Sequence, residues 1–186
     1  MKRKVIIALF IALCAVSSIG ILLYIDTKAE NNKLQTAIDN LQLIIQNTPE
    51  VTPAINVADL YAGVNAERAK NGLTALQINT NLEVSACAKL SDMVAKSYWA
   101  HVAPDGTTPW IFIINAGYSY SIAGENLAKG FNTAEGAMKG WIASPEHEEN
   151  IVGNYTNMGI CTTQAVLEAY KGNKTPINIV VNHFAR

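Results

Sequence analysis

The chain has 186 residues, of which 49% are hydrophobic and 16% are charged, and its 14 basic side chains nearly balance 15 acidic ones. This length is enough for one domain with a substantial core and for additional segments. The net charge of −1 and the lack of any basic stripe argue against nucleic acid as a partner, because phosphate recognition needs clustered Lys and Arg.

Residues 1–25 have the pattern of an N-terminal signal anchor. Lys2, Arg3 and Lys4 precede an uncharged apolar run, Val5–Ile25. At about 1.5 Å per residue, this run can cross a hydrocarbon core of about 30 Å, and the basic cluster stays in the cytoplasm. We therefore expect a single-pass membrane protein whose remainder lies outside the cell. The alternative is a signal peptide cleaved near residues 15–17, which would give a secreted protein but leave an apolar N-terminus.

Residues 26–53 are expected to form a helical stalk followed by a linker. Leu34, Ile38, Leu41 and Ile45 have the spacing of a heptad seam, over fewer than two heptads. The two prolines of residues 48–53 would end the helix and stiffen the linker. Such a seam predicts, at most, a weak homodimer between stalks tethered in one membrane.

Residues 54–186 carry the helix and strand patterns of one domain. Apolar residues at helical spacing predict four helices; Thr80 and Glu83 have capping-box spacing at the second, and Thr133 is the expected N-cap of the fourth. Strand patterns cover residues 118–127, 157–169 and 177–184. The last two strands are expected to form an antiparallel hairpin around Asn173. Helices clustered early and strands clustered late predict the α+β class.

Two cysteines, Cys87 and Cys161, lie beyond the predicted anchor. In an oxidising compartment this pair can form a disulfide. Two buried free thiols are the alternative, since Cys is among the most buried residue types. The sequence does not choose between them, because it does not give the distance between the two Cα atoms.

Three polar blocks interrupt the helix patterns and contain the residues best suited to chemistry. They span residues 101–106, 124–128 and 141–151. Two of the three histidines, His101 and His147, lie in the outer blocks, and Glu125 lies in the middle one. Imidazole and carboxylate groups bind borderline metals and transfer protons near neutral pH. A fold that brings the blocks together would therefore create a functional site.

His147 is predicted in the first turn of a short helix, with Ser144 as N-cap and Pro145 at the first position. The helix dipole there disfavours imidazolium, whereas the acidic neighbours of His147 favour it, so the direction of its pKa shift stays open. The segment is not an HExxH zinc-protease motif, because position 151 is Ile151. No GxSxG elbow occurs either, so the sequence lacks the common hydrolase signatures.

The blocks, in this order, resemble the CAP domain, the SCP-like family of cysteine-rich secretory proteins, antigen 5 and plant pathogenesis-related proteins. The similarity covers about residues 57–184 and is strongest to the short form found in bacterial extracellular proteins. The matching motifs are His101 with Pro104-Asp105-Gly106, Ala116-Gly117-Tyr118, Gly124-Glu125-Asn126-Leu127-Ala128, Trp141 with Ser144-Pro145-x-His147-x-x-Asn150-Ile151, Gly159-Ile160, and Val181-Asn182-x-Phe184.

The resemblance implies an α-β-α sandwich with a central antiparallel sheet and a cleft that holds His101, Glu125 and His147. Members of the family are linked to metal binding, lipid or sterol export, and cell-wall or host interactions, and share no single catalytic activity. This chain departs from many short members by carrying Glu146 and Glu148 beside the second histidine. A more acidic rim favours a divalent cation and disfavours an anionic ligand.

The expected function is binding of a cell-surface, cell-wall or lipid ligand in this cleft. His101 and His147 are candidate ligands of Zn²⁺ or another divalent cation, with Glu125 as their orienting carboxylate or as a base; the alternative is that all three only hold loops together. A metal- or His-assisted hydrolase with these three as catalytic residues, acting on cell-wall or peptide substrates, and a lipid- or sterol-binding module are the other functions considered. His183 is expected to be partly exposed, and the three tryptophans are expected in the core.

Overall fold

The structure is a computed structural model that describes residues 28–43, 54–167 and 175–186. The chain divides into two compact units, Met1–Glu50 and Val51–Arg186. The predicted anchor, residues 1–25, lies outside the described residues. Within the described ranges, no helix combines the length and apolarity needed to cross a membrane.

In the first unit, residues 28–43 are helical and lie within the segment predicted as a stalk. Their side chains are exposed, including Leu34 at 61% and Leu41 at 59%. Gln35 donates to the Asp39 carboxylate over 2.8 Å, one turn further along. Ile45 and the predicted linker fall outside the described residues.

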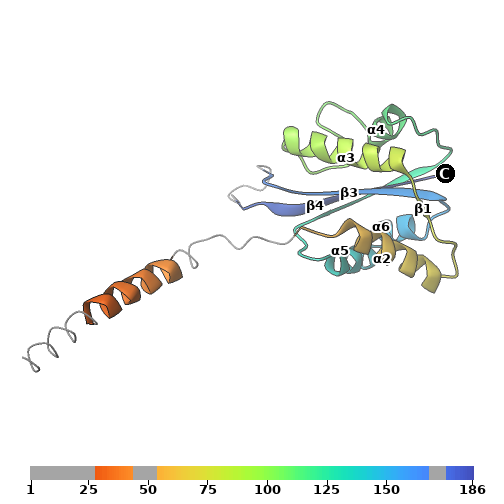
Figure 1. The fold of residues 1–186 in the computed structure, drawn as a ribbon. Coiled ribbons are helices and arrows are strands. Elements are labelled where there is room, and N and C mark those ends of the chain that lie inside the picture. The colour runs from red at the N-terminus through yellow and green to blue at the C-terminus, as the bar shows by residue number, and fades with distance from the viewer. Residues whose placement is uncertain (1–27, 44–53, 168–174) are drawn as a thin grey trace, which may run out of the picture. The chain divides into compact units, whose positions relative to one another are not determined.

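The second unit is an α+β domain of three layers (Figure 1). Its four-stranded sheet has the order β1-β3-β4-β2. Helices α3 and α4 lie over one face, and α2, α5 and α6 lie over the other. The elements are α2 (Val57–Lys70), β1 (Gln77–Ile78), α3 (Thr80–Ala95), α4 (Pro109–Asn115), β2 (Ala123–Lys129), α5 (Ala134–Ile142), α6 (Pro145–Ile151), β3 (Asn157–Ala165) and β4 (Ile177–Ala185).

The three long strands pair in antiparallel fashion, β2 with β4 and β4 with β3. The predicted pairing of the last two strands is confirmed, while Asn173 lies outside the described residues. The first predicted strand begins at Ala123, later than expected. β1 pairs in parallel with β3, with Gln77 opposite Asn157, so the predicted antiparallel sheet has an additional parallel strand at this edge. A strand of two residues is too short to show the alternation by which strands are predicted.

Side chains at the helix starts satisfy the free backbone amides there. The Thr133 hydroxyl accepts from the Gly136 amide over 3.1 Å, which confirms Thr133 as the N-cap of α5. For α3 the capping residue is Asn79, whose side chain accepts from two amides of the first turn. The predicted capping box at Thr80 is therefore wrong by one residue.

A hydrophobic core lies on each face of the sheet because helices cover both faces. On the face covered by α2, α5 and α6, Trp141 is 1% exposed and packs in one cluster with Val180 and Phe184. On the face covered by α3, Ile179 and Val181 are fully buried. The prediction of a core tryptophan is confirmed for Trp141, whereas the other two tryptophans are only half-buried.

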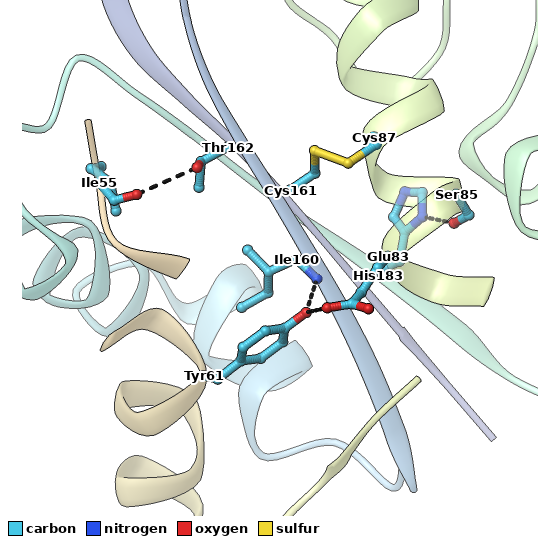
Figure 2. The surroundings of a disulfide bond; sticks show 9 residues. All are labelled: Ile55, Tyr61, Glu83, Ser85, Cys87, Ile160, Cys161, Thr162 and His183. Carbon is cyan, nitrogen blue, oxygen red and sulfur yellow. Dashed lines mark hydrogen bonds between the residues drawn. A yellow bond between two sulfur atoms is a disulfide. The ribbon is translucent and has the colours of Figure 1, made fainter. Parts of the chain in front are cut away.

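A disulfide joins Cys87 on α3 to Cys161 on β3 (Figure 2), which decides between the two alternatives left open by the sequence. The residues are 74 apart in the chain, and their Cα atoms are 5.0 Å apart. Closing a loop of this length in the unfolded chain corresponds to about 4 kcal/mol of stabilisation. Cys87 is solvent-exposed, so a reductant can reach the bond.

Helix α3 lies very close to the sheet at Gly159. A Cβ atom at Gly159 would be 2.2 Å from the backbone nitrogen of Glu83, which is too close for any side chain. Gly159 is the register partner of His183 on β4. The Tyr61 hydroxyl, from the opposite layer, donates to the Glu83 carboxylate and accepts from the Ile160 amide, each over 2.9 Å (Figure 2). The start of α3 is therefore fixed against β3, the strand that pairs with β4 beside His183.

Candidate functional site

Glu125 is a buried carboxylate in the middle of β2, 4% exposed. Its Oε1 lies 2.5 Å from Nδ1 of His101, which belongs to the loop between α3 and α4. A carboxylate only accepts hydrogen bonds, so Nδ1 of His101 carries the hydrogen, and in the neutral ring Nε2 then keeps its lone pair. The His101 side chain is 54% exposed, which leaves this lone pair accessible to a ligand. The structure thus brings together two of the three predicted site residues.

His183 is the register partner of Glu125 on β4 and completes the surroundings of the carboxylate. Its Nε2 lies 3.0 Å from Glu125 Oε2, and its Nδ1 is hydrogen-bonded to the Ser85 hydroxyl of α3. His183 is 0% exposed, so the prediction of a partly exposed residue is wrong. The last strand of the chain is an inner strand of the sheet, covered by helices on both faces, and no local pattern indicates that position.

The charge of Glu125 is set by opposing effects. Burial raises the pKa of this carboxyl, but hydrogen bonds from His101 and His183, together with the electrostatic influence of His183 and Lys89, outweigh burial and hold the pKa below its usual value. Glu125 is therefore ionised at neutral pH, as the hydrogen-bond pattern requires.

Lys89 of α3 is a fully buried lysine that holds the His101 loop. Its ammonium donates to the Tyr98 hydroxyl and to the carbonyl oxygens of Ala100 and His101, over 2.9, 2.9 and 2.7 Å. Burial lowers the pKa of this amine, and the Glu125 charge acts in the opposite direction. The sequence prediction missed Lys89, although its place three residues after Ala86 puts it on the predicted buried stripe of the helix.

His147 lies in the first turn of α6, as predicted, and is half-buried. Burial is the largest effect that lowers its pKa, the nearby His101 ring acts in the same direction, and Glu146 offsets part of this lowering. The direction of this pKa shift, which the sequence left open, is therefore downward and favours the neutral ring. Its Nδ1 is buried and has no hydrogen-bond partner within the described part of the chain.

An amide network ties α6 to β2 beside Glu125. Asn126 donates to the backbone oxygen of His147 over 2.9 Å. Asn150 donates to the Asn126 side chain over 2.9 Å and to the backbone oxygen of Glu125 over 3.2 Å. These two asparagines act as structural hydrogen-bonding residues, in agreement with their sequence-based interpretation.

An open hollow of about 370 Å³ adjoins His101 and Glu125. His147 does not line it within the described ranges, so the structure gathers His101 and Glu125 in one hollow and leaves His147 beside it. Its lining residues are His101, Val102, Thr108, Pro109, Trp110, Ala123, Gly124, Glu125 and Asn150.

The donor set for a metal ion is small. Both Glu125 oxygens are hydrogen-bonded to histidines, so neither is free as a ligand. Two imidazoles remain, from His101 and His147, whereas catalytic zinc sites use three protein ligands. Over the described ranges, no group of three or more His, Cys, Asp or Glu side chains is arranged to hold a metal ion. The described residues therefore do not fit a tight structural zinc site, which uses four protein ligands.

Comparison with known families shows to which protein family the second unit belongs. Residues 61–174 match the sequence model of CAP, the cysteine-rich secretory protein family. The chain belongs to this family, which confirms the resemblance drawn from the motifs. The uncharacterized protein YkwD of Bacillus subtilis (strain 168) is 44% identical over 97 residues, which are 52% of this chain and 38% of that protein. The chain therefore spans well under half the length of this curated relative.

Solved structures share the fold. An extracellular protein containing an SCP domain from Bacillus anthracis str. Ames superimposes with a TM-score of 0.57 at 21% identity, over 69% of this chain and 39% of that chain. An outer surface protein from Borrelia burgdorferi superimposes with a TM-score of 0.57 at 23% identity, over 73% of this chain and 99% of that chain. At these identities the likeness establishes the fold alone.

Proposed function

We propose that this chain is a cell-surface CAP protein that binds an extracellular ligand in the hollow beside His101. The supporting observation is the 2.5 Å contact between His101 Nδ1 and the buried Glu125 carboxylate, which leaves Nε2 of an exposed ring as a fixed hydrogen-bond acceptor. A ligand that offers a hydroxyl or amide hydrogen can donate to Nε2 of His101. The glycan and peptide parts of a cell wall carry such hydrogens.

The charge of the rim limits the class of ligand. Glu146 and Glu149 of α6 are exposed beside His147. A local excess of negative charge disfavours anionic ligands and favours neutral or cationic ones. We therefore expect neutral glycan–peptide fragments to bind better than phosphate-rich polymers of the same wall.

A divalent cation is a second component of this proposal. His101 and His147 would hold it, and the cation would supply a positive charge that polarises a ligand carbonyl or hydroxyl. Calorimetry with Zn²⁺ on the full chain should give weak binding that disappears in both His101→Ala and His147→Ala. Binding that persists in both variants would place the cation elsewhere on the chain.

A hydrolase is the second candidate function, favoured by one observation. An imidazole whose Nδ1 is held by a carboxylate is the arrangement of a general base, because the other nitrogen can accept a proton. Turnover of cell-wall or peptide substrates that is lost in both His101→Ala and Glu125→Gln would establish it over simple binding.

A lipid-binding role has its own supporting observation in the apolar residues near the hollow. Val102 lines the hollow and is 49% exposed, and Ile111 and Ile114 of α4 are 43% and 56% exposed. Lipid that co-purifies with wild type and with Glu125→Gln, but not with Val102→Ser/Ile114→Ser, would support this role.

Display on the cell surface completes the proposal. The B. anthracis and Borrelia structures belong to an extracellular and an outer surface protein, respectively. We propose that residues 1–25 anchor the chain in the membrane and that residues 26–53 act as a stalk that can pair weakly with a second copy. Protease accessibility of the second unit on intact cells, with the chain retained in the membrane fraction, tests this arrangement.

Ligand binding is tested by co-sedimentation of the full chain, reconstituted in detergent, with insoluble cell-wall material. Wild type should sediment with the wall, and His101→Ala should not. Lys139→Ala, an exposed residue of α5, is the matched control and should behave as wild type. Equal sedimentation of wild type and His101→Ala would reject the hollow as the binding site.

A further inference from the structure

A continuous chain of hydrogen bonds runs beneath the proposed binding site. The Ser85 hydroxyl contacts Nδ1 of His183, Nε2 of His183 contacts one Glu125 oxygen, and the other Glu125 oxygen contacts Nδ1 of His101. The four residues come from α3, β4, β2 and the loop before α4. Only the last of them, His101, has an exposed side chain.

Ser85, His183 and Glu125 have the connectivity of a serine–histidine–acid triad, but their burial excludes nucleophilic catalysis by Ser85. Ser85 and His183 are both 0% exposed, and the Ser85 side chain of α3 is turned toward the His183 ring (Figure 2). A substrate carbonyl therefore cannot reach the hydroxyl, and a nucleophile needs such contact. The end of the chain that meets solvent is the His101 ring.

The hydrogen bonds in this chain converge on the Glu125 carboxylate from both sides. The Glu125 carboxylate can only accept, so both histidines donate to it, His183 through Nε2 and His101 through Nδ1. With Nε2 of a neutral His183 protonated, its Nδ1 accepts from the Ser85 hydroxyl. Every polar atom of the chain is then paired except Nε2 of His101, which is the atom available to a ligand.

We infer that Ser85 and His183 are positioning residues that hold the Glu125 carboxylate in the orientation that fixes His101 as its Nδ1–H tautomer. This inference rests on the proposed function, in which Nε2 of His101 accepts a hydrogen bond from the ligand. Ser85 and His183 touch no ligand themselves and act through Glu125.

The packing around His183 explains why this arrangement is held firmly. Gly159, opposite His183 on β3, allows the start of α3 to approach the sheet, and this approach brings Ser85 to the imidazole. Without His183, one buried oxygen of Glu125 would lose its partner, and an unpaired buried polar atom is costly. The carboxylate would then turn to find another donor and would no longer hold Nδ1 of His101.

The test is the tautomer of His101, read from ¹⁵N and ¹³C shifts of the histidine rings in the ligand-free full chain, in detergent, at a pH of about 8.5, where an ordinary imidazole is neutral. Wild type should show the Nδ1–H form. His183→Leu should lose that signature, and His183→Gln should retain it because its side-chain amide can still donate to Glu125. An unchanged His101 signature in folded His183→Leu would overturn the inference.

A second variant keeps the inference testable if His183→Leu does not fold. Ser85→Ala removes only the hydroxyl and should weaken the Nδ1–H signature, whereas Ser91→Ala, at an exposed position of the same helix, should leave it unchanged. Equal spectra for Ser85→Ala and Ser91→Ala would overturn the role of Ser85. The tautomer is measured without ligand, so its outcome does not depend on the proposed function. If no ligand binds, the tautomer measurement still tests the positioning role. If a ligand binds but the tautomer is wrong, the positioning role is refuted and the proposed function is not.

Discussion

At the scale of single residues, Glu125 combines near-complete burial with full hydrogen bonding. We expect Glu125→Gln to lower the free energy of unfolding at pH 7 by about 1.5–3 kcal/mol, the range for a hydrogen bond to a charged group. The carboxyl pKa is held below its usual 4.5 in the folded chain, so its stabilisation is present above pH 4.5 and is lost as the pH falls through the folded-state value. Urea unfolding at pH 7 and at lower pH should show the difference between the two proteins shrinking; a pH-independent difference would contradict this assignment.

Lys89 gives a second prediction at this scale. Lys89→Met keeps the length of the side chain but removes three donors, so the backbone oxygens of Ala100 and His101 lose their partner. Fully buried, each unsatisfied group would cost about 1–3 kcal/mol; these oxygens are partly buried, so we expect the lower end of that range and a mobile His101 loop. Urea unfolding and hydrogen exchange of residues 99–103 measure both effects. Lys139→Met, on the surface, should change neither.

The residues of the site differ in how far the sequence could predict them. Glu125 and His101 stood out because they lie in short polar blocks between apolar segments. Lys89 and His183 did not, because a lysine on a helix and a histidine on a strand are ordinary until their burial is known. Ser85 has no local signal at all, since its role depends on a contact with a residue 98 positions away.

At the scale of elements, the disulfide links the helix and the strand beside the site. Reduction should lower the free energy of unfolding by about 4 kcal/mol, because a long loop in the unfolded chain is no longer closed. Thermal unfolding with and without dithiothreitol measures this change, and Cys87→Ser/Cys161→Ser should match the reduced wild type and be insensitive to the reductant. An oxidised wild type no more stable than the double variant would contradict the estimate.

The helices of the second unit could be predicted from apolar spacing and caps, because both signals lie within a few residues of each other. The order of the strands could not. The parallel pairing of β1 with β3 joins residues near position 77 to residues near 157, and the strand is too short to leave a pattern. The inner position of β4, which buries His183, is a property of the whole sheet and is not encoded in the strand itself.

At the scale of the whole molecule, the chain combines a CAP domain with an N-terminal segment of a different character. The family could be predicted because several weak motifs occur in one order, although each of them alone is common. The ligand could not, because a fold does not determine a function, which depends on the side chains of the site. The acidic residues beside His147 are such a variation.

The most direct test of the central claim is the response of the His101 ring to soluble cell-wall glycan–peptide fragments, followed by ¹⁵N spectra of the full chain in detergent. We predict a saturable shift of the His101 Nε2 resonance, absent when Glu125→Ala removes the acceptor that holds the ring. A shift confined to other parts of the chain, such as the groove between α2 and α5 lined by Gly63 and Met138, with His101 unchanged, would contradict the account.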